Sequence, residues 1–592
     1  MKQQHSDTEL YDVERKTIQR TTVDTKRLLF TRFEDLSNEL IYEMFELLDG
    51  YDLFEIFSNL NSRFQNLLTH PTLRINMNLS SMSESTFHRF RAFGILPNKH
   101  RIKSLHLSSP FAVDLIFSPP RCIPKFSQLK TLILDDINSR YLDQLLHFLT
   151  LLPYLSSLIL SLADRFRNKM ILYPRIFLIP MLKYCKLSYQ AGSGRMLLPI
   201  TTNQCKIAAL LSYTPRLRHL SCRKLAYDAY QTMEMPIVPN NLTKASFEFF
   251  GLFNFDQFEP LIRKNFRQLH CLRISISKND RSYLDAKQWE RLILTSMAYL
   301  RIFDIQYKGW VYKESSGKTQ FYDLIDQFDS TFWFDRQWFF AHQSYEKEHA
   351  ISVLFYSIQP YRRQSYTLYS HPEEKICPHR QQTTFDTVRH LYIDEEQSIA
   401  NCLFQFPKCT NLTLLKSFCK NCDSTITSLH RIIPLMQLTN LAIRCLNLFF
   451  DTIIEVLHST PNIQILEVDS EYPLELNPIS IEQTEKLRLI SNENKIQSLT
   501  ISRGCTSKVA EVFINLCRRV QRIDMNISTN EFESTVRVLL MKHNINSHHL
   551  RLLILRYLSV TSFKKIEHMV HAEKLLDSSS IKFVYNRLYL WW

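Results

Sequence analysis

The sequence contains very little glycine, 8 residues in 592. Glycine supplies the unusual backbone angles of phosphate-binding loops and of two-residue hairpin turns, so its scarcity argues against both. The chain also lacks the run of consecutive lysines and arginines that marks a nucleic-acid-binding arm. Its formal charge of +14 is modest over this length, and composition alone does not choose between acidic proteins and nucleic acids as partners.

Long apolar runs are missing as well, and no stretch has the length of a membrane-spanning helix. Residues 1–32 are polar and of mixed charge, so we expect a flexible tail there rather than a signal peptide. The 13 cysteines are scattered and odd in number, which favours reduced thiols. We therefore expect a cytoplasmic or nuclear protein with no membrane partner. A hydrophobic fraction of 45% indicates a globular chain with ample core.

Three short helices are predicted in residues 33–79. Ser37 is placed to cap the first, and Glu39 lies in its first turn, where the helix dipole favours a carboxylate. Asp49-Gly50 breaks the chain, and the third helix stops before His70-Pro71, because the residue before proline avoids the α region. The apolar residues at helical spacing are Leu40, Ile41, Met44, Phe45 and Leu48, then Leu53, Ile56, Phe57 and Leu60, then Phe64, Leu67 and Leu68.

The family resemblance of this stretch rests on Leu36-Ser37, Glu39-Leu40, Ile41, Met44, Phe45, Leu47-Leu48, Asp52-Leu53 and Ser62-Arg63-Phe64. These residues resemble an F-box, the three-helix module through which substrate receptors bind the Skp-type adaptor of cullin–RING ubiquitin ligases. Two positions depart from the family pattern: Ser37 replaces a proline, and Phe64 follows Arg63 with no residue between. A generic three-helix cap on a larger domain is the alternative. The resemblance implies adaptor contacts by Leu36, Glu39, Leu40, Ile41, Met44, Asp52 and Leu53.

A second pattern governs residues 80–592. The unit is Φ-x-x-Φ-x-Φ, where Φ is apolar or cysteine, and most copies lie about 24–35 residues apart, near or somewhat beyond the usual period of leucine-rich repeats. The second Φ of successive copies is Leu105, Leu132, Leu158, Cys185, Leu220, Ala245, Leu272, Phe303, Leu391, Leu412, Leu441, Leu466, Leu499, Ile523 and Leu553.

The last two Φ positions alternate as a half-buried strand requires, and helical stripes lie between the copies. Each strand–helix unit leaves an apolar face that its neighbours must cover. The chain therefore resembles a degenerate leucine-rich-repeat protein. We expect an α/β fold: an F-box at 33–79, then a curved solenoid with a parallel sheet on one side and helices on the other. An ordinary multidomain α/β fold is the alternative.

The array is interrupted at about 306–387. This stretch contains Trp310, the cluster 333–340 and four tyrosines between 356 and 369. Such aromatic density is usual in cores and interfaces. Aberrant repeats and an insertion folded against the solenoid both fit this composition.

Two motifs could carry chemistry, and each has a simpler interpretation. Ser315 to Thr319 end like a phosphate-binding loop, but Tyr312 occupies the place of the first glycine, which favours a polar loop. Cys419 and Cys422 have metal-ligand spacing, with Cys377, His379, Cys402 and Cys409 nearby in the sequence. No second C-x-x-C accompanies them, which favours plain thiols over zinc. We find no catalytic constellation, and expect a non-enzymatic protein without cofactor or metal.

The residue between the last two Φ positions should point away from the core, onto the concave strand surface. The residues there are of mixed charge, which suits a protein partner better than a nucleic-acid backbone. Arg273 and Tyr392 are the residue types most often found as interface anchors. The predicted substrate-binding residues are His106, Lys186, Arg273, Tyr392 and Glu467.

The predicted function is that of a substrate-recognition subunit of an SCF-type ubiquitin ligase. Its F-box would dock on the Skp-type adaptor, and through it on a cullin, while the repeats bind a target protein. The alternative is an F-box-like repeat scaffold for protein–protein interaction outside any ligase. A basic solenoid that binds RNA is a more distant interpretation. The sequence does not identify the target.

Overall fold

The computed structural model describes the chain from residue 33 onward. The residues left undescribed are 1–32, 81, 138, 163–174, 177, 190–199, 202–217, 227–240, 251–253, 278–279, 313–322, 347–349, 360–361, 370–372, 377–383, 401, 417–421, 446–449, 471–480, 528–530, 541–548, 577–579 and 585. The predicted tail, the loop Ser315–Thr319 and the residues Cys377, His379 and Cys419 therefore lie outside the described residues. The chain divides into two compact units, Met1–Asn76 and Met77–Trp592.

The described part of the smaller unit begins with the 3-10 turn Phe33–Asp35 and contains the helices α2 (Asn38–Leu47), α3 (Gly50–Phe57) and α4 (Ser62–Thr69). Ser37 caps α2 as predicted, accepting a hydrogen bond from the Leu40 amide. Asp49 does more than break the chain, because its carboxylate caps α3 by accepting from the Tyr51 amide at 2.9 Å. The three predicted helices are therefore present, with boundaries shifted by a residue or so.

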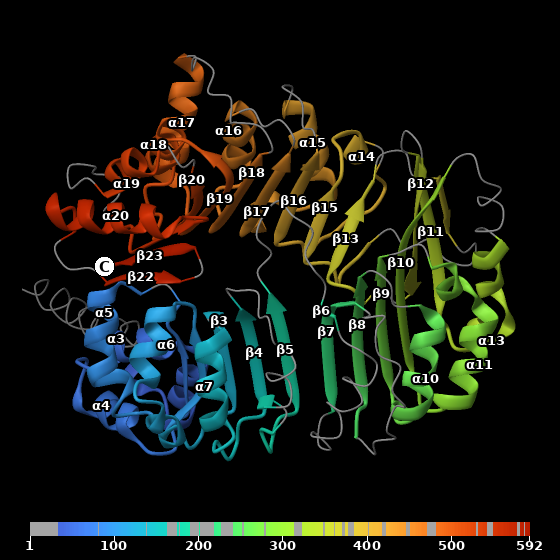
Figure 1. Cartoon of the computed structure of the whole chain (residues 1–592), viewed down its shortest axis with the longest axis horizontal. Helices are drawn as coiled ribbons and strands as arrows, with labels where there is room; N and C mark the ends of the chain where they lie inside the picture. The colour runs from blue at the N-terminus through green and yellow to red at the C-terminus, as the bar shows by residue number, and fades with distance from the viewer. Residues whose placement is uncertain are drawn as a thin grey trace, which may run out of the picture. The chain divides into compact units, whose positions relative to one another are not determined.

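The larger unit is a mixed α/β structure built around two sheets (Figure 1). The strands of the first sheet are β1 (Ile75–Asn78), β2 (Ile102–Leu107), β3 (Thr131–Ile137), β4 (Ser157–Leu162), β5 (Tyr184–Tyr189), β6 (Ile200–Thr201), β7 (His219–Ala226), β8 (Lys244–Phe250), β9 (Cys271–Ser277), β10 (Ile302–Tyr312), β11 (Phe339–Glu346), β12 (Ala350–Gln359) and β14 (Glu373–Ile376). The strands of the second are β13 (Ser365–Leu368), β15 (His390–Ile393), β16 (Asn411–Lys416), β17 (Asn440–Cys445), β18 (Ile465–Ser470), β19 (Ser498–Cys505), β20 (Arg522–Ile527), β21 (Leu552–Arg556), β22 (Ser580–Val584) and β23 (Arg587–Trp591).

Helices connect most of the described strands. They are α5 (Glu84–Phe90), the π-helix Arg91–Ile95, α6 (Pro110–Phe117), α7 (Ser139–Leu149), α10 (Phe255–Asn265), α11 (Ala286–Ser296), α13 (Thr331–Asp335), α14 (Gln397–Ala400), α15 (Cys422–Ile432), α16 (Phe450–Ser459), α17 (Ile481–Glu493), α18 (Ser507–Leu516), α19 (Phe532–Leu540) and α20 (Val560–Ala572), with short 3-10 turns at Pro120–Lys125, Arg281–Leu284, Gln327–Asp329 and Leu435–Gln437. Figure 1 shows helices α14 to α20 along one side of the second sheet.

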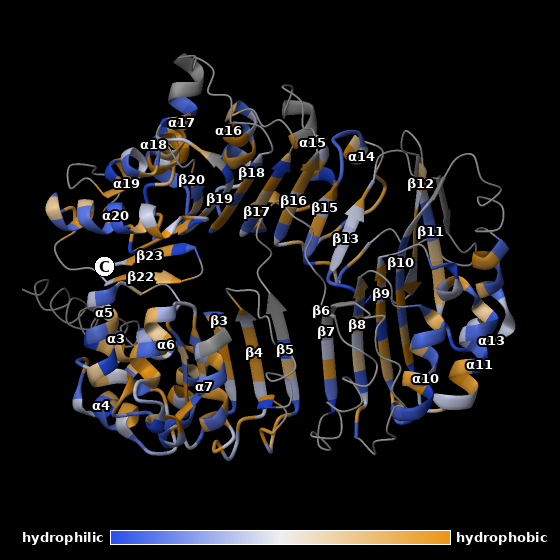
Figure 2. Ribbon diagram, viewed as in Figure 1, coloured by the Kyte–Doolittle hydropathy of each residue, from blue (hydrophilic) through white to orange (hydrophobic). Residues whose placement is uncertain are grey.

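The predicted strand alignment is confirmed position by position. In the first sheet Leu105 is paired with Leu132, Leu132 with Leu158, and the row continues through the parallel strands to Phe303. In the second sheet the row runs from Leu391 to Leu553 in the same way. Every residue of both rows is at most 2% exposed. Figure 2 shows the resulting alternation of apolar and polar residues along the strands.

Within the described residues, the strands depart from a single parallel sheet in two places. At 306–387 strand β10 is followed by the antiparallel strands β11 and β12, and the second sheet then begins at β13. The aromatic cluster fills the core under this hairpin: Trp333, Trp338 and Phe340 are buried, although Phe334 is half exposed. The second antiparallel element is the hairpin β22–β23, which pairs with β21.

This last hairpin contacts the first elements of the larger unit. Trp591 stacks on Phe111 and donates its indole N–H to the Met82 carbonyl at 2.9 Å. The Ser580 amide donates to the Glu84 carboxylate at 2.9 Å, and the Glu84 amide donates to the Trp592 carbonyl. Residues about 500 positions apart are therefore packed together within this unit.

Candidate protein-binding surfaces

The smaller unit buries an aromatic core. The rings of Phe33 and Phe57 lie against Phe64, each with centroids 5.5 Å from it, and Phe45 packs on Phe57 at 4.9 Å. Arg63 ties the chain before α2 to this core. Its guanidinium donates to the Leu36 carbonyl at 2.7 Å and to the Asn38 side chain at 2.6 Å, and also to the Glu34 carbonyl. Because Phe64 directly follows Arg63, one side chain points into the core and the other holds the segment that leads into α2.

The seven residues predicted to bind an adaptor fall into two groups. Ile41 and Leu53 are buried and support the helices from within, and Leu36 is half-buried. Glu39, Leu40, Met44 and Asp52 are exposed. A hydrogen bond from its own backbone amide, with a second from Ser37, lowers the pKa of Glu39. The exposed group is therefore a mixture of acidic and apolar side chains around the start of α2 and α3.

The exposed apolar surface of this unit is larger than predicted. Leu40, Met44 and Leu47 follow one another at i, i+4 and i+7 along α2, and Leu47 is 86% exposed. Ile56 and Leu60 lie at helical spacing with Leu53, but unlike Leu53 both are at least half exposed. This apolar stripe could have been found from the spacing of Leu47 alone, because it continues the line of Leu40 and Met44.

On the larger unit, the residues predicted for substrate binding lie on the strand faces, but most already have partners. The guanidinium Nε of Arg273 donates to the Asp304 carboxylate at 2.7 Å, and its Nη2 donates to the Arg362 carbonyl. The ring of Tyr392 stacks on His390 with centroids 4.1 Å apart. Lys186 is half-buried on β5, aligned with Ile159 and Ser221. These three side chains are thus integrated into the strand face.

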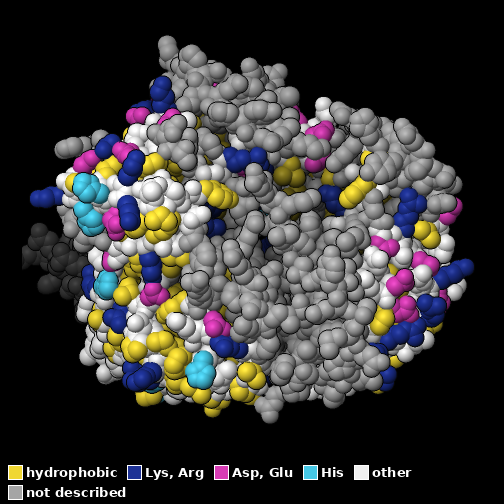
Figure 3. Space-filling view, in the orientation of Figure 1, with side chains coloured by type: hydrophobic (Ala, Val, Ile, Leu, Met, Phe, Trp, Pro, Cys, Tyr) yellow, Lys and Arg dark blue, Asp and Glu magenta, His cyan; other side chains and the backbone are white. Residues whose placement is uncertain are grey.

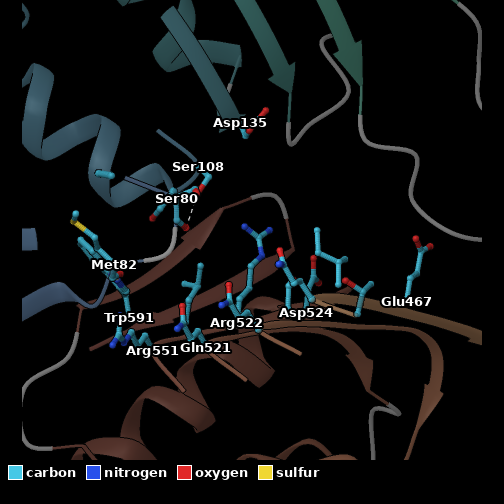
Figure 4. A pocket seen from close by; sticks show the side chains of 18 of the residues that line it. Ser80, Met82, Ser108, Asp135, Glu467, Gln521, Arg522, Asp524, Arg551 and Trp591 are labelled. Carbon is cyan, nitrogen blue, oxygen red and sulfur yellow. Dashed lines mark hydrogen bonds between the residues drawn. The ribbon is translucent and has the colours of Figure 1, made fainter. Parts of the chain in front are cut away.

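His106 and Glu467 differ from the other three, because both line a cavity of about 900 Å³ (Figure 4). His106 comes from β2 and lies 2.7 Å from the Asp135 carboxylate. Glu467 comes from β18 and accepts from Arg444 at 3.1 Å. The cavity, called the junction pocket below, is bounded by both sheets. Its lining residues are Asn78, Leu79, Ser80, Met82, His106, Ser108, Ser109, Ala112, Asp135, Arg444, Gln464, Ile465, Glu467, Asp469, Gln497, Ser498, Thr500, Ser502, Gln521, Arg522, Asp524, Arg551, Leu552, Arg556 and Trp591.

A buried ion pair links the two sheets beside this pocket. Strand β3 shifts register between Leu134 and Ile137, and Asp136 adopts a φ of 57°, a conformation that aspartate tolerates better than most residues. Its carboxylate accepts from Arg522 of the second sheet at 3.0 Å. Burial raises the pKa of Asp136 above its usual value, although Arg522 opposes the shift. Sequence periodicity carries no signal for this contact.

A matching link lies at the β10–β13 boundary. The guanidinium of Arg363, which is buried just before β13, donates to the Asp304 carboxylate at 2.9 Å, to the Ser275 hydroxyl at 2.6 Å and to the Ile274 carbonyl at 2.7 Å. At each of the two links, an aspartate of the first sheet (Asp136 or Asp304) pairs with an arginine from outside that sheet (Arg522 or Arg363).

The cysteine and metal predictions are partly covered by the structure. Cys402 and Cys409 are buried free thiols, and burial raises the pKa of Cys409 to about 11. Within the described residues no group of histidine, cysteine and carboxylate side chains is arranged to hold a metal ion. Among the helices that are described, none combines the length and apolarity needed to cross a bilayer.

Comparison with known proteins adds no name to these surfaces. No protein-family model matches the chain, and no curated protein matches it significantly.

Proposed function

We propose that this chain is a substrate-recognition subunit of an SCF-type ubiquitin ligase. The smaller unit docks on a Skp-type adaptor and the larger unit, a repeat solenoid, holds a target protein. The protein then supplies proximity rather than chemistry. The proposal rests on the F-box resemblance of residues 33–79, and the single observation that carries it is the exposed apolar stripe of α2.

The stripe is unusual for a surface helix of ten residues. Leu40, Met44 and Leu47 expose their side chains along α2, and Ile56 of α3 and Leu60 after it are exposed as well. Contiguous exposed apolar groups of this kind mark protein-binding sites, because removing apolar surface from water lowers the free energy. The exposed carboxylate of Glu39 directly precedes Leu40 and gives this end of the stripe a polar neighbour.

The mixed surface of the larger unit also supports a protein target over RNA. On the described part of the face drawn in Figure 3, basic and acidic side chains are interspersed rather than gathered by sign. The arginines Arg444, Arg556 and Arg522 each pair with a carboxylate. A phosphate backbone would have to displace these carboxylates, whereas a protein partner need not.

The stripe can be tested with a variant that leaves the core intact. Leu40 and Leu47 are both changed to glutamate in the full chain, which places charges on the proposed contact without touching Ile41 or Leu53. We expect co-purification with a recombinant Skp-type adaptor to fall at least tenfold. The matched control is Leu403→Glu, because Leu403 is 83% exposed on the larger unit and should not contact the adaptor.

If the full chain fails to bind the adaptor, or if the double variant binds as well as the original, the ligase proposal loses its support. The alternative, a repeat scaffold outside any ligase, then remains. Loss of binding in Leu403→Glu as well would point to a general effect of charge.

A further inference from the structure

The junction pocket has a composition that restricts its ligand. Figure 4 shows Arg551, Gln521, Arg522, Asp524 and Glu467 along one side, with other labelled residues facing them. In this first group Glu467 lies on β18, Arg522 and Asp524 lie on β20, and Gln521 and Arg551 directly precede β20 and β21. The facing residues include Ser80, Ser108 and Asp135, so a bound molecule would touch both sheets.

Three of the four arginines that line the pocket are paired with carboxylates. The guanidinium of Arg556 makes two hydrogen bonds to the Asp524 carboxylate, at 2.5 and 2.6 Å. Arg444 pairs with Glu467 at 3.1 Å, and Arg522 pairs with Asp136 at 3.0 Å. The lining contains four arginines and four carboxylates, so their formal charges cancel. A phosphate or a strongly acidic ligand would have to break existing pairs, and its binding is disfavoured.

Neutral hydrogen-bonding groups occupy the remaining lining. Gln464, Gln497 and Gln521 each precede one of the adjacent strands β18, β19 and β20. Their backbones are in register: the backbone N–H of Gln497 donates to the backbone carbonyl of Gln464, and that of Gln521 donates to the backbone carbonyl of Gln497, both at 2.8 Å. Ser498 and Thr500 add hydroxyls on β19. Carboxamides and hydroxyls can each both donate and accept, which matches the alternating N–H and C=O groups of a peptide backbone.

The span of this lining sets the length of ligand. Neighbouring strands lie about 4.8 Å apart, so the three intervals from β18 to β21 cover roughly 14 Å. An extended peptide advances about 3.4 Å per residue, and roughly four residues therefore cross these strands. A cavity of about 900 Å³ accommodates a segment of this size.

We propose that the junction pocket binds a short extended peptide of the target protein, polar and with little or no net charge, laid across β18 to β21 and contacted by both sheets. This inference rests on the proposed function, since it names the class of segment that the larger unit would capture. It also moves the site away from Arg273 and Tyr392, which pair elsewhere.

The test uses the full chain and a bead-displayed library of random hexapeptides in which phosphoserine is one of the building blocks. We expect the retained peptides to be rich in neutral polar residues, near zero in net charge and depleted in phosphoserine. Two variants of the second sheet, Gln497→Leu and Thr500→Val, should each reduce retention at least tenfold. Asp135→Asn tests the opposite side of the pocket and should reduce it too.

The matched control is Gln268→Leu, an exposed glutamine three residues before β9 of the first sheet, outside the pocket. This variant should retain peptides normally. Enrichment of phosphoserine or of acidic peptides, equal retention by all variants, or no retention at all would each overturn the proposal. Adaptor binding by the same preparations is measured separately, so failure of the pocket is distinguishable from failure of the ligase assignment.

Discussion

His390 shows how a single strand residue is set by its surroundings. Its ring is half-buried between Tyr392 and the Thr413 hydroxyl, which lies 2.8 Å from the imidazole Nε2. Burial lowers the pKa of His390 to about 4, and the charge of Arg444 adds to the shift. Between about pH 6.5 and pH 4 the imidazole is therefore mostly protonated in the unfolded chain but mostly neutral in the folded protein.

This predicts a pH dependence of stability. Between an unfolded pKa of about 6.5 and the folded value of about 4, the unfolded state binds more protons. Stability is then fully present above pH 6.5 and is lost as the pH falls toward 4. His390→Gln, which can still hydrogen-bond to Thr413, should show a smaller loss between pH 7 and pH 5 in denaturant unfolding. Equal losses in the two proteins would contradict the assignment.

At the scale of the strand, the buried rows decide stability. Leu441 is paired with Leu412 and Leu466 and is 1% exposed, whereas Ile465, one residue before Leu466, is 43% exposed. Leu441→Ala removes methyl groups from a packed row and leaves a cavity, at a cost of about 2–5 kcal/mol in the free energy of unfolding. Ile465→Ala is the control.

We expect Ile465→Ala to cost well under half as much as Leu441→Ala. The measurement is the shift in the denaturant midpoint of the full chain at constant slope. A similar shift for the two variants would mean that side chains in the buried row do not stabilise the fold more than exposed ones on the same strands.

Local pattern predicts these elements well because their causes are local. The alternation at Leu105 and Leu107 specifies a half-buried strand, and its repetition aligns each strand with the next. The contacts of Asp136 with Arg522, 386 residues apart, leave no periodic trace. For the same reason the junction pocket, including Trp591 and Ser80, could not be predicted. The exposure of Ile56 was also missed, because helical spacing identifies a stripe but not what covers it.

At the scale of the larger unit, the ion pair of Asp136 and Arg522 joins the two sheets. The Asp136 side chain is 2% exposed, and Arg522 is a quarter exposed. Asp136→Ala leaves the guanidiniums of Arg522 and Arg587 without their carboxylate, and should cost about 3–5 kcal/mol. Because burial raises the pKa of Asp136, pairing does not fully offset its desolvation.

The double variant Asp136→Leu with Arg522→Met should therefore be less destabilised than Asp136→Ala alone, as judged by chemical denaturation. If the double variant is as unstable as Asp136→Ala, the ion pair itself stabilises the fold, and the cost of Asp136→Ala is not only that of leaving a buried arginine unpaired.

The packing of Ser580 on Glu84 also has a consequence for synthesis on the ribosome. An open stack of repeats can acquire its structure progressively as it emerges, because each unit contacts its neighbours. Here the partner of Glu84, Ser580, is synthesised 496 residues later. At about 5–20 residues per second, the interval is roughly 25–100 s. Throughout that time the apolar surfaces of Phe87 and Phe111, which Trp591 later covers, stay accessible to chaperones.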